Sequence, residues 1–453
     1  MGADKQMEIQ SLKLTNFRGI EQAELALDGK SAVIYGINGM GKSTVLQACS
    51  ILFFRILNML TESDLGSDGK VKIEDSDIKI GAQTARISMQ LNIDHTIYPY
   101  FRSAESNGKR IHLVGEAKRI VEQFRRLYVG QYMVLEEEET DESDRESTRE
   151  LVFNESNMPI YASYGVNRYV SDRRNKVLKK DIKLAGKLEA LRDVFDPTIN
   201  FQLFFEWFRG RQEYENSKRV EKESFKDAQL SAVREAILKI MNNDFSDIKI
   251  KIDDEDAQMV AVKHHTELSI AQLSEGEKCV LAMTGDLARK LAIANPSREN
   301  PLEGEGVVLI DEVDLHLHPS WQGRMMPLLF RTFPNIQFIV TTHSPKVLSE
   351  IKAEANIFEI YQDGNAINVR KQNPMNGWDI NHIMHDFMHT DILNEKTQKL
   401  IDEIYNCIEN ENLDQAEELV DQLAKITDEM NVEVVRARTL IHRKRYYEKD
   451  IQK

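Results

Sequence analysis

A glycine-rich segment that ends in a lysine and two hydroxyl residues is the part of the chain best suited to bind phosphate. Residues 36–44 fit the pattern G-x-x-x-x-G-K-[ST]. Glycines let the backbone curl so that successive N–H groups converge on phosphate oxygens, and the start of a following helix adds positive potential. We therefore predict a phosphate-binding loop. The residues predicted to line it are Asn38, Gly39, Gly41, Lys42, Ser43 and Thr44.

The segments on either side of this loop have the character that a nucleotide site requires. Residues 31–35 are a short apolar run that predicts a buried strand, and residues 44–54 are apolar-rich and predict a helix. The order strand, loop, helix favours a nucleotide site over the alternative, an ordinary glycine turn before a core helix. In that context Lys42 is expected to reach the β- and γ-phosphates, and Ser43 to bind Mg²⁺.

A second segment combines a buried strand with two carboxylates. Residues 307–310 are all apolar and predict a central strand, and Asp311 and Glu312 follow at its carboxyl end. Asp311 is suited to hold Mg²⁺, and Glu312 to polarise an attacking water. Taken alone, the segment also fits a strand that ends in a solvated acidic turn. The phosphate-binding loop favours the catalytic interpretation.

The segment 273–278 opens a third predicted element, a helix, and two interpretations of it remain open. Ser274 and Glu277 have the spacing of a capping box, which is a purely structural role. The same hydroxyl, together with Gly276 and the helix N-terminus, also makes a second anion site. Two phosphate sites in one chain suggest that this segment of one copy closes on the nucleotide of another copy.

Two further segments, 314–316 and 341–344, complete a set of motifs whose order resembles that of ABC-type ATPase heads. The resemblance implies an α/β fold in which an N-terminal antiparallel β lobe joins a parallel-sheet, RecA-like P-loop lobe, with a helical insertion and a helical C-terminal extension. It implies ATP and Mg²⁺ as cofactors and slow hydrolysis of ATP to ADP and phosphate. The residues implied in catalysis are Lys42, Glu312 and His343, and those implied in binding Mg²⁺ are Ser43 and Asp311.

The resemblance also implies that two heads form a homodimer around the nucleotide. Ser274, Gly276 and Glu277 match the signature that contacts the γ-phosphate bound to the opposing protomer. Asp314 matches a residue at the dimer seam, where Ser274 also lies. His343 matches the histidine that senses the γ-phosphate, although a histidine that merely satisfies a strand end is the simpler alternative.

The N-terminal strand narrows the resemblance to heads of the SMC/RecF/OLD class. Arg18, within residues 16–19, resembles the N-terminal arginine that approaches the nucleotide phosphates in those heads. The glutamine that supplies a further Mg²⁺ ligand in the family has no clear match. Gln83 is the candidate, and this ligand stays open.

Composition restricts the class of protein. A formal net charge of −15 argues against a surface that is basic throughout and attracts nucleic acid. No apolar run approaches the roughly 18–20 residues that span a bilayer, and the N-terminus lacks the apolar segment of a secretion signal. The three cysteines, Cys49, Cys279 and Cys407, are far apart in sequence, and the first two have apolar neighbours. We therefore expect a cytoplasmic protein that does not enter membranes.

The spacing of the motifs predicts the domain organisation. The interval between Thr44 and the signature is much longer than in transporter heads, and it lacks the sustained heptads of a coiled coil. Compact helical insertions of this kind are typical of RecF-, OLD- and defence-type ATPases. The predicted regions are 1–165 (first part of the head, with the phosphate loop), 166–245 (helical insertion), 246–375 (second part of the head) and 376–453 (helical partner or oligomerisation region).

The tail distinguishes among these relatives. The chain after Asn373 is too short for the Toprim nuclease of OLD proteins, so we expect no nuclease site. Residues 376–385 resemble the tail of small antiphage ATPases, in particular the Septu ATPase subunit (PtuA-like), whose partner is a separate HNH nuclease. The resemblance implies control of such an effector in antiphage defence. The alternatives are a RecF-like DNA-repair ATPase and an assembly scaffold that binds nucleotide with little turnover.

Two clusters of side chains have weaker interpretations. His382, His385 and His389 share one helical face and could hold Zn²⁺, but neighbouring methionines favour ordinary packing. A basic run within residues 168–183 is read as a solvated face, with contact to nucleic acid as the minority alternative. Its members are Arg168, Arg173, Arg174, Lys176, Lys179, Lys180 and Lys183.

Overall fold

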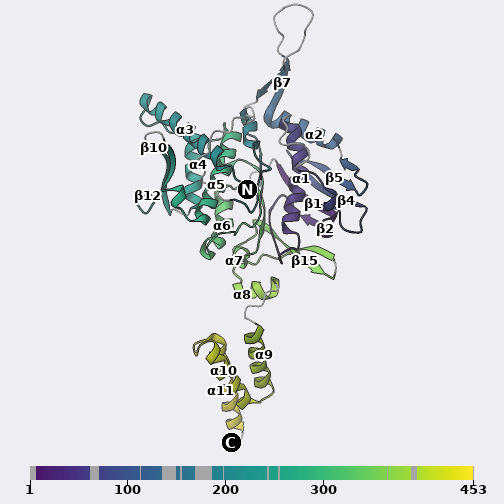
Figure 1. Ribbon diagram of the computed structural model, residues 1–453, viewed down its shortest axis with the longest axis vertical. Coiled ribbons are helices and arrows are strands. Elements are labelled where there is room, and N and C mark those ends of the chain that lie inside the picture. The colour runs from purple at the N-terminus through teal and green to yellow at the C-terminus, as the bar shows by residue number, and fades with distance from the viewer. Residues whose placement is uncertain are drawn as a thin grey trace, which may run out of the picture. The chain divides into compact units, whose positions relative to one another are not determined.

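The structure is a computed structural model of the 453-residue chain. It describes residues 7–61, 71–112, 114–134, 149–153, 156–168, 186–196, 198–241, 244–253, 256–364, 366–388 and 395–451. The chain forms two compact units, Met1–Trp378 and Asp379–Lys453 (Figure 1). Each unit is described by itself.

A mixed sheet forms the centre of the first unit. Within the described residues it has eleven strands, in the order β6-β5-β4-β1-β2-β16-β15-β3-β14-β13-β9. In that order the strands are Arg110–His112, Thr96–Glu105, Thr84–Ile93, Met7–Phe17, Ile20–Ala26, Ala366–Gln372, Ala355–Asp363, Ser31–Gly36, Ile336–Thr342, Gly306–Ile310 and Ile160–Tyr164.

One half of this sheet is parallel and buried on both faces. Strands β9, β13, β14, β3 and β15 run parallel as neighbours. Every residue of β3, β13 and β14 is buried, as expected for strands covered on both sides. Because neighbouring parallel strands end at the same edge, the segments that follow β3, β13 and β14 are brought together there.

The rest of the sheet is antiparallel except where β2 pairs with β16, which is parallel. β1 pairs with β2 on one side and with β4 on the other, and β4 pairs with β5. Along much of β4 buried residues alternate with exposed or partly exposed ones, as in a sheet with one face packed on the core. The predicted fold class, an antiparallel lobe joined to a parallel P-loop lobe, is confirmed by this topology.

Helices cover the sheet. They are α1 (Lys42–Thr61), α2 (Val114–Phe124), α3 (Phe201–Glu221), α4 (Ala228–Ile240), α5 (Glu275–Ala294), α6 (Pro319–Thr332) and the short α7 (Pro345–Leu348). Two small sheets accompany them: β7–β8 (Gly130–Val134 and Arg149–Phe153) and β10–β11–β12 (Phe245–Asp253, Asp256–Lys263 and Thr266–Ser269). In Figure 1 the teal elements α3 to α5 and β10 to β12 gather beside the parallel half of the sheet.

Helix α1 corrects one expectation from the sequence. Among the described residues it is the one helix long and apolar enough to cross a membrane by length and composition. However, 67% of its apolar window is buried inside the protein. It begins at the predicted phosphate loop and contacts the central sheet. Its apolar character is therefore explained by its place in the core.

The second unit contains three helices that pack on one another: α9 (Glu395–Glu409), α10 (Leu413–Ile426) and α11 (Val432–Ile451). Its core includes Ile401, Ile404, Ile408, Val420 and Leu423, with Leu400 and Leu419 packed against it. A short helix, α8 (Ile380–His382), precedes them.

A buried group of charges holds α5 against the parallel sheet. Asp286 accepts hydrogen bonds from Arg289 (2.7 Å), from Lys290 (3.1 Å) and from the hydroxyl of Tyr164 at the end of β9 (2.9 Å). All three charged side chains are buried. Burial alone would raise the pKa of Asp286, but Lys290 and Arg289 lower it to about 2.

Replacing Asp286 tests this group. Asp286→Asn leaves Arg289 and Lys290 buried without an anion, and we expect a loss of about 3–5 kcal/mol in the free energy of unfolding. Urea unfolding followed by tryptophan fluorescence measures it, because Trp207, Trp321 and Trp378 all lie in the first unit. Asp363→Asn, at an exposed strand end, is the control and should change stability by less than about 0.5 kcal/mol.

The same buried group predicts how the stability of the protein depends on pH. Because the folded pKa of Asp286 lies below the unfolded value of about 3.9, its stabilisation is fully present above that value and is lost as pH falls toward about 2. The wild type should therefore lose more stability than Asp286→Asn over this range. Equal losses would contradict the assigned role of Asp286.

Candidate nucleotide-binding site

The predicted phosphate loop connects β3 to α1. Gly39 has φ of +81° and Gly41 has φ of +96°, values in the left-handed region that glycine adopts without strain. The tip, Ile37 to Gly39, is exposed, whereas Lys42 and the residues from Thr44 to Leu46 are buried. The loop thus presents its backbone to solvent at the N-terminus of a long helix, where N–H groups lack helical partners.

Lys42 lies inside this loop. Its side chain is buried, and its ammonium donates hydrogen bonds to the carbonyl oxygens of Gly36 (2.8 Å) and Ile37 (3.1 Å). Burial lowers the pKa of Lys42, while Glu312, Asp311 and, to a lesser extent, Asp314 oppose that shift. The lysine therefore shares one electrostatic environment with the carboxylates that follow β13.

Asp311 joins the loop to the neighbouring strands. Its Oδ1 accepts hydrogen bonds from the Ser43 hydroxyl (3.1 Å) and from the Thr341 hydroxyl (2.5 Å). Ser43 lies after β3 at the start of α1, Asp311 directly follows β13, and Thr341 lies near the end of β14. The three residues meet because these strands are neighbours in the sheet. The exposed Ser43–Asp311 pair offers the hard oxygen donors that Mg²⁺ prefers.

This donor set fits a cation held mainly by phosphate and water. The described residues contain no group of three or more histidine, cysteine, aspartate or glutamate side chains suited to a metal ion. Mg²⁺ in nucleotide sites typically takes one or two protein ligands and completes its shell with phosphate oxygens and water. Ser43 and Asp311 are therefore a chemically suitable pair.

Glu312 is held in an unusual backbone conformation. Its φ is +48°, a region that glutamate seldom adopts, and its N–H donates to the Thr341 hydroxyl at 2.7 Å. Strain of this kind persists only where surrounding contacts impose it, and it is concentrated at functional sites. The Glu312 carboxylate is near enough to oppose the lowering of the pKa that burial causes at both Lys42 and His343.

The segment after β14 is tied to Asp314. The Oδ1 of Asp314 accepts hydrogen bonds from the Thr342 hydroxyl (2.5 Å) and from the backbone N–H of His343 (3.3 Å). Burial and then the nearby Lys42 lower the pKa of His343, against the opposing influence of Glu312 and Asp314. A neutral imidazole is thereby favoured near pH 7, and it can donate or accept a hydrogen bond.

The signature segment contains the capping box that its spacing predicts. The hydroxyl of Ser274 accepts from the N–H of Glu277 (3.3 Å), and the Glu277 carboxylate accepts from the N–H of Ser274 (2.9 Å). Lys263 pairs with Glu277 at 2.5 Å. Gly276 is required for space, because a Cβ there would lie 2.6 Å from the carbonyl oxygen of His316.

An open hollow of about 520 Å³ surrounds this segment, lined among others by Lys263, Ser274, Gly276, His316 and Trp321. Ser274 is exposed in it. The Ser274 hydroxyl donates its hydrogen to the Glu277 carboxylate at 2.7 Å, so an anion there binds either to the backbone N–H groups of the helix N-terminus or to this hydroxyl once its hydrogen has turned away from Glu277.

Two further predicted residues, Arg18 and Gln83, lie at a turn beside the phosphate loop and before β4, respectively. Arg18 has φ of +54° at the turn between β1 and β2, and its Nε donates to Asp77 at 2.8 Å. This turn lies beside the phosphate loop, since the side chain of Ile20 is 3.6 Å from where a Cβ of Gly41 would lie. Gln83 is exposed before β4, and its carbonyl oxygen accepts from the N–H of Ser106.

The structure corrects the interpretation of Arg168 and adds two hydroxyls. Arg168 was assigned to a solvated basic face, but its side chain is buried and bonds to the chain after β13. The rest of that run, from residue 169 on, lies outside the described residues. Thr341 and Thr342 belong to the segment 341–344, and the sequence assigns no role to either hydroxyl. Their place at the end of an apolar strand was the one sequence signal for their role.

The histidine cluster is described only in part. His382 and His385 both contact Asp386, at 3.1 Å and 2.6 Å. His389 lies outside the described residues, so the predicted trio as a whole is not described.

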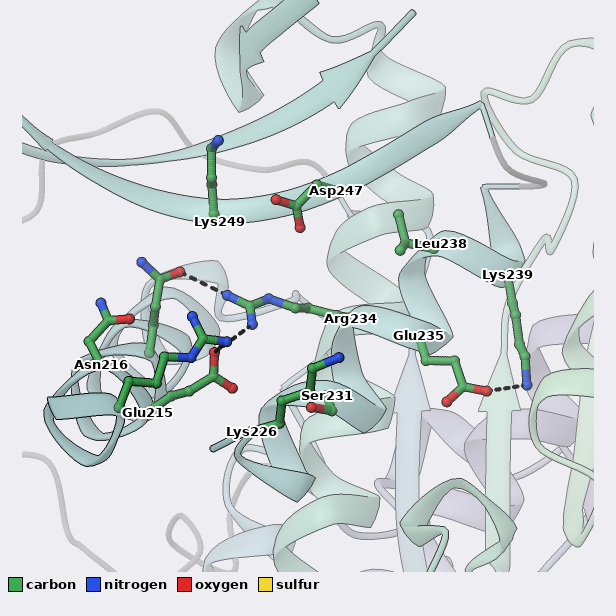
Figure 2. Close-up of a pocket in the computed structure, with 12 residues that line it drawn as sticks. Glu215, Asn216, Lys226, Ser231, Arg234, Glu235, Leu238, Lys239, Asp247 and Lys249 are labelled. Carbon is green, nitrogen blue, oxygen red and sulfur yellow. Dashed lines mark hydrogen bonds and ion pairs between the residues drawn. The ribbon is translucent and has the colours of Figure 1, made fainter. Parts of the chain in front are cut away.

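A larger hollow, of about 700 Å³, lies among α3, α4 and β10 (Figure 2). At its centre Arg234 donates to Glu215 (3.3 Å), to Gln212 (3.2 Å) and to the carbonyl oxygen of Ile248 (3.2 Å). Glu215 also pairs with Arg219. Glu215 faces two guanidinium groups, so the charges at the centre of the hollow are paired but not neutral, whereas the phosphate loop exposes unpaired backbone at a helix N-terminus.

With this geometry in place, comparison with known proteins decides the family. A family model described as an AAA ATPase domain matches residues 7–348. The chain belongs to this AAA ATPase family. The predicted ABC-type head is thereby placed among ATPases.

Two curated relatives narrow the class of this AAA ATPase. The "Retron Vc95 probable ATPase" of Vibrio cholerae serotype O1 biovar El Tor is 30% identical over 77% of this chain and 72% of the relative. The "Septu protein PtuA" of Bacillus thuringiensis is 24% identical over 84% of both chains. The predicted resemblance to Septu ATPases is confirmed, whereas the similarity to a retron ATPase was not predicted.

Solved structures with a similar fold include an SMC head bound to the C-terminal winged-helix domain of ScpA. It is 16% identical, with a TM-score of 0.45, and the match covers 81% of this chain and 98% of that one.

Removing the lysine of the loop tests the site. Lys42→Ala should weaken binding of a fluorescent ATP analogue by at least about 100-fold, because the cation that faces the phosphates is lost. Lys352→Ala removes an exposed lysine and should bind as the wild type does. Unchanged binding by Lys42→Ala would remove the phosphate-loop assignment.

Proposed function

We propose that this ATPase hydrolyses ATP between two copies of its head and that the resulting cycle of closure and release controls a separate effector. One arrangement carries the proposal: the phosphate loop, Ser43, Asp311 and Glu312 meet at a single edge of the sheet. That geometry and the order of the motifs support the role proposed for each residue.

The triphosphate is bound by the loop backbone and by Lys42. Ser43 and Asp311 hold Mg²⁺, which when bound neutralises charge on the phosphates. Glu312 polarises a water molecule, whose oxygen forms a bond to the γ-phosphorus while the bond to the bridging oxygen breaks and ADP leaves. His343, uncharged because of its burial beside Lys42, donates a hydrogen bond to the γ-phosphate.

The second half of each site comes from the other copy. Ser274 and Gly276 lie at the N-terminus of α5, in an open hollow that accommodates an anion. A γ-phosphate held there brings Glu277 close, and the Lys263–Glu277 pair limits the resulting repulsion. Asp314 lies at the seam. Because nucleotide binds the closed dimer better than the open monomer, ATP shifts the equilibrium toward the dimer.

The effector is proposed from the relatives. Similarity to a Septu protein and to a retron ATPase supports a role in antiphage defence, and the Septu resemblance supports an HNH nuclease as partner. The C-terminal unit is the proposed partner surface, because it is compact in itself and exposes Ile426, Met430 and Val432. Nucleic acid is contacted through the partner or through the remaining basic residues of the run, within 173–183.

The catalytic glutamate provides the test of the cycle. Glu312→Gln should lower phosphate release by about 100-fold or more, leave the Kd for ATP unchanged and convert the protein to a dimer at saturating ATP. Phosphate release, titration with a fluorescent ATP analogue and light scattering measure the three effects. Glu299→Gln, at an exposed loop position, is the control and should behave as the wild type. A Glu312→Gln protein that stays monomeric with ATP bound would rule out the switch.

The partner surface has its own test. Ile426→Glu combined with Val432→Glu places charges on side chains that are 67% and 76% exposed. We expect this variant to lose the proposed partner, a co-expressed HNH nuclease, on co-purification while keeping wild-type ATP turnover. Ile97→Glu, a 55% exposed position on β5, is the matched control. If the double variant retained the partner, the interface would lie on another surface of the chain.

A further inference from the structure

Arg168 is a buried cation that the hydrolytic roles above do not use. Its side chain is only 5% exposed, although it lies four residues after the end of β9. Burial lowers its pKa, and the nearby Asp311, Asp314 and Glu312 counter that shift. Placing a guanidinium in the interior costs free energy unless it is hydrogen-bonded, so its contacts indicate what keeps it there.

Those contacts converge on the turn that carries the two acidic residues. The Nη2 of Arg168 donates to the carbonyl oxygen of Asp311 at 2.8 Å and to that of Glu312 at 2.5 Å. β13 ends at Ile310, so both carbonyl groups lie beyond its ladder. One planar donor therefore holds two successive carbonyls, and it does so where Glu312 has the strained φ of +48°.

Arg168 also links this turn to α5. Its Nη1 donates to the Sδ of Met283 at 3.8 Å, and Met283 is buried within α5. A parallel connection runs through Tyr164, whose carbonyl oxygen accepts from the N–H of Asp311 (2.8 Å) and whose hydroxyl donates to Asp286 of α5 (2.9 Å). The end of β13 is thus joined twice to the helix that begins after Ser274.

We propose that Arg168 is a positioning residue, which keeps the Asp311–Glu312 turn in the shape needed for hydrolysis and couples that turn to α5. This rests on the proposed ATPase function and deepens it. In the proposed dimer Glu312 acts on the nucleotide of its own copy, whereas Ser274 acts on that of the partner. Arg168 therefore connects the two nucleotide sites within one copy of the chain.

The contacts of Arg168 determine which substitutions test its role. Arg168→Met keeps much of the side-chain length and its contact with Met283 but removes every donor to the two carbonyls. Arg168→Lys keeps a cation that can reach one of them. Arg234→Met is the matched control, because Arg234 also donates to a backbone carbonyl, that of Ile248, but does so among α3, α4 and β10 (Figure 2).

We expect Arg168→Met to lower kcat for phosphate release by about 100-fold, the scale on which a displacement of about 1 Å acts. Its Kd for ATP and its KM should stay within about twofold of wild type, and the ATP-dependent dimer should persist, because binding groups are untouched. Arg168→Lys should recover about tenfold of the lost rate. Arg234→Met should turn over ATP as the wild type does.

Three outcomes would overturn the proposal: a kcat for Arg168→Met within twofold of wild type, a parallel loss of ATP binding and turnover, or the same loss of kcat in Arg234→Met. The first leaves the ATPase function intact and removes only the positioning role. The second and third indicate general support of the fold. A wild type whose turnover equals that of Glu312→Gln would instead refute the proposed function, and the role of Arg168 with it.

Discussion

A single carboxylate oxygen of Asp311 accepts hydrogen bonds from Ser43 and Thr341, and the rest of the site depends on this contact. It joins the ends of three strands that are neighbours in the sheet, in the order β3, β14, β13. Because these strands are parallel, their carboxyl ends lie at one edge. The phosphate loop, the acidic turn and the segment with His343 can then act on one small volume.

The charges around this edge are balanced in a way that suits phosphate chemistry. The buried Lys42 is bonded to carbonyl oxygens of its own loop, and the acidic residues after β13 favour its charged form. An arriving triphosphate brings further negative charge close to Asp311 and Glu312. A cation is therefore needed between them, which is the electrostatic reason for pairing a hydroxyl with a carboxylate.

The motifs were predictable because each is local. The pattern of residues 36–44 encodes a turn that only glycine adopts easily, and an apolar run before Asp311 predicts a strand wherever it lies. The hydrogen bonds of Arg168 to the turn after β13 were not predictable, because Asp311 is far from Arg168 in the sequence. A basic run in a polar segment is usually solvated, and nothing local distinguishes Arg168, whose side chain turns inward.

The sequence by itself determined the family, the phosphate loop, the acidic turn and the helix cap at Ser274, because hydrogen bonding and backbone preference over a few residues suffice for each. Only the tertiary structure decided which hydroxyls meet Asp311 and that Arg168 holds the carbonyls beside Glu312. Such contacts depend on strand order and on burial, and both result from packing across the whole sheet rather than from neighbouring residues.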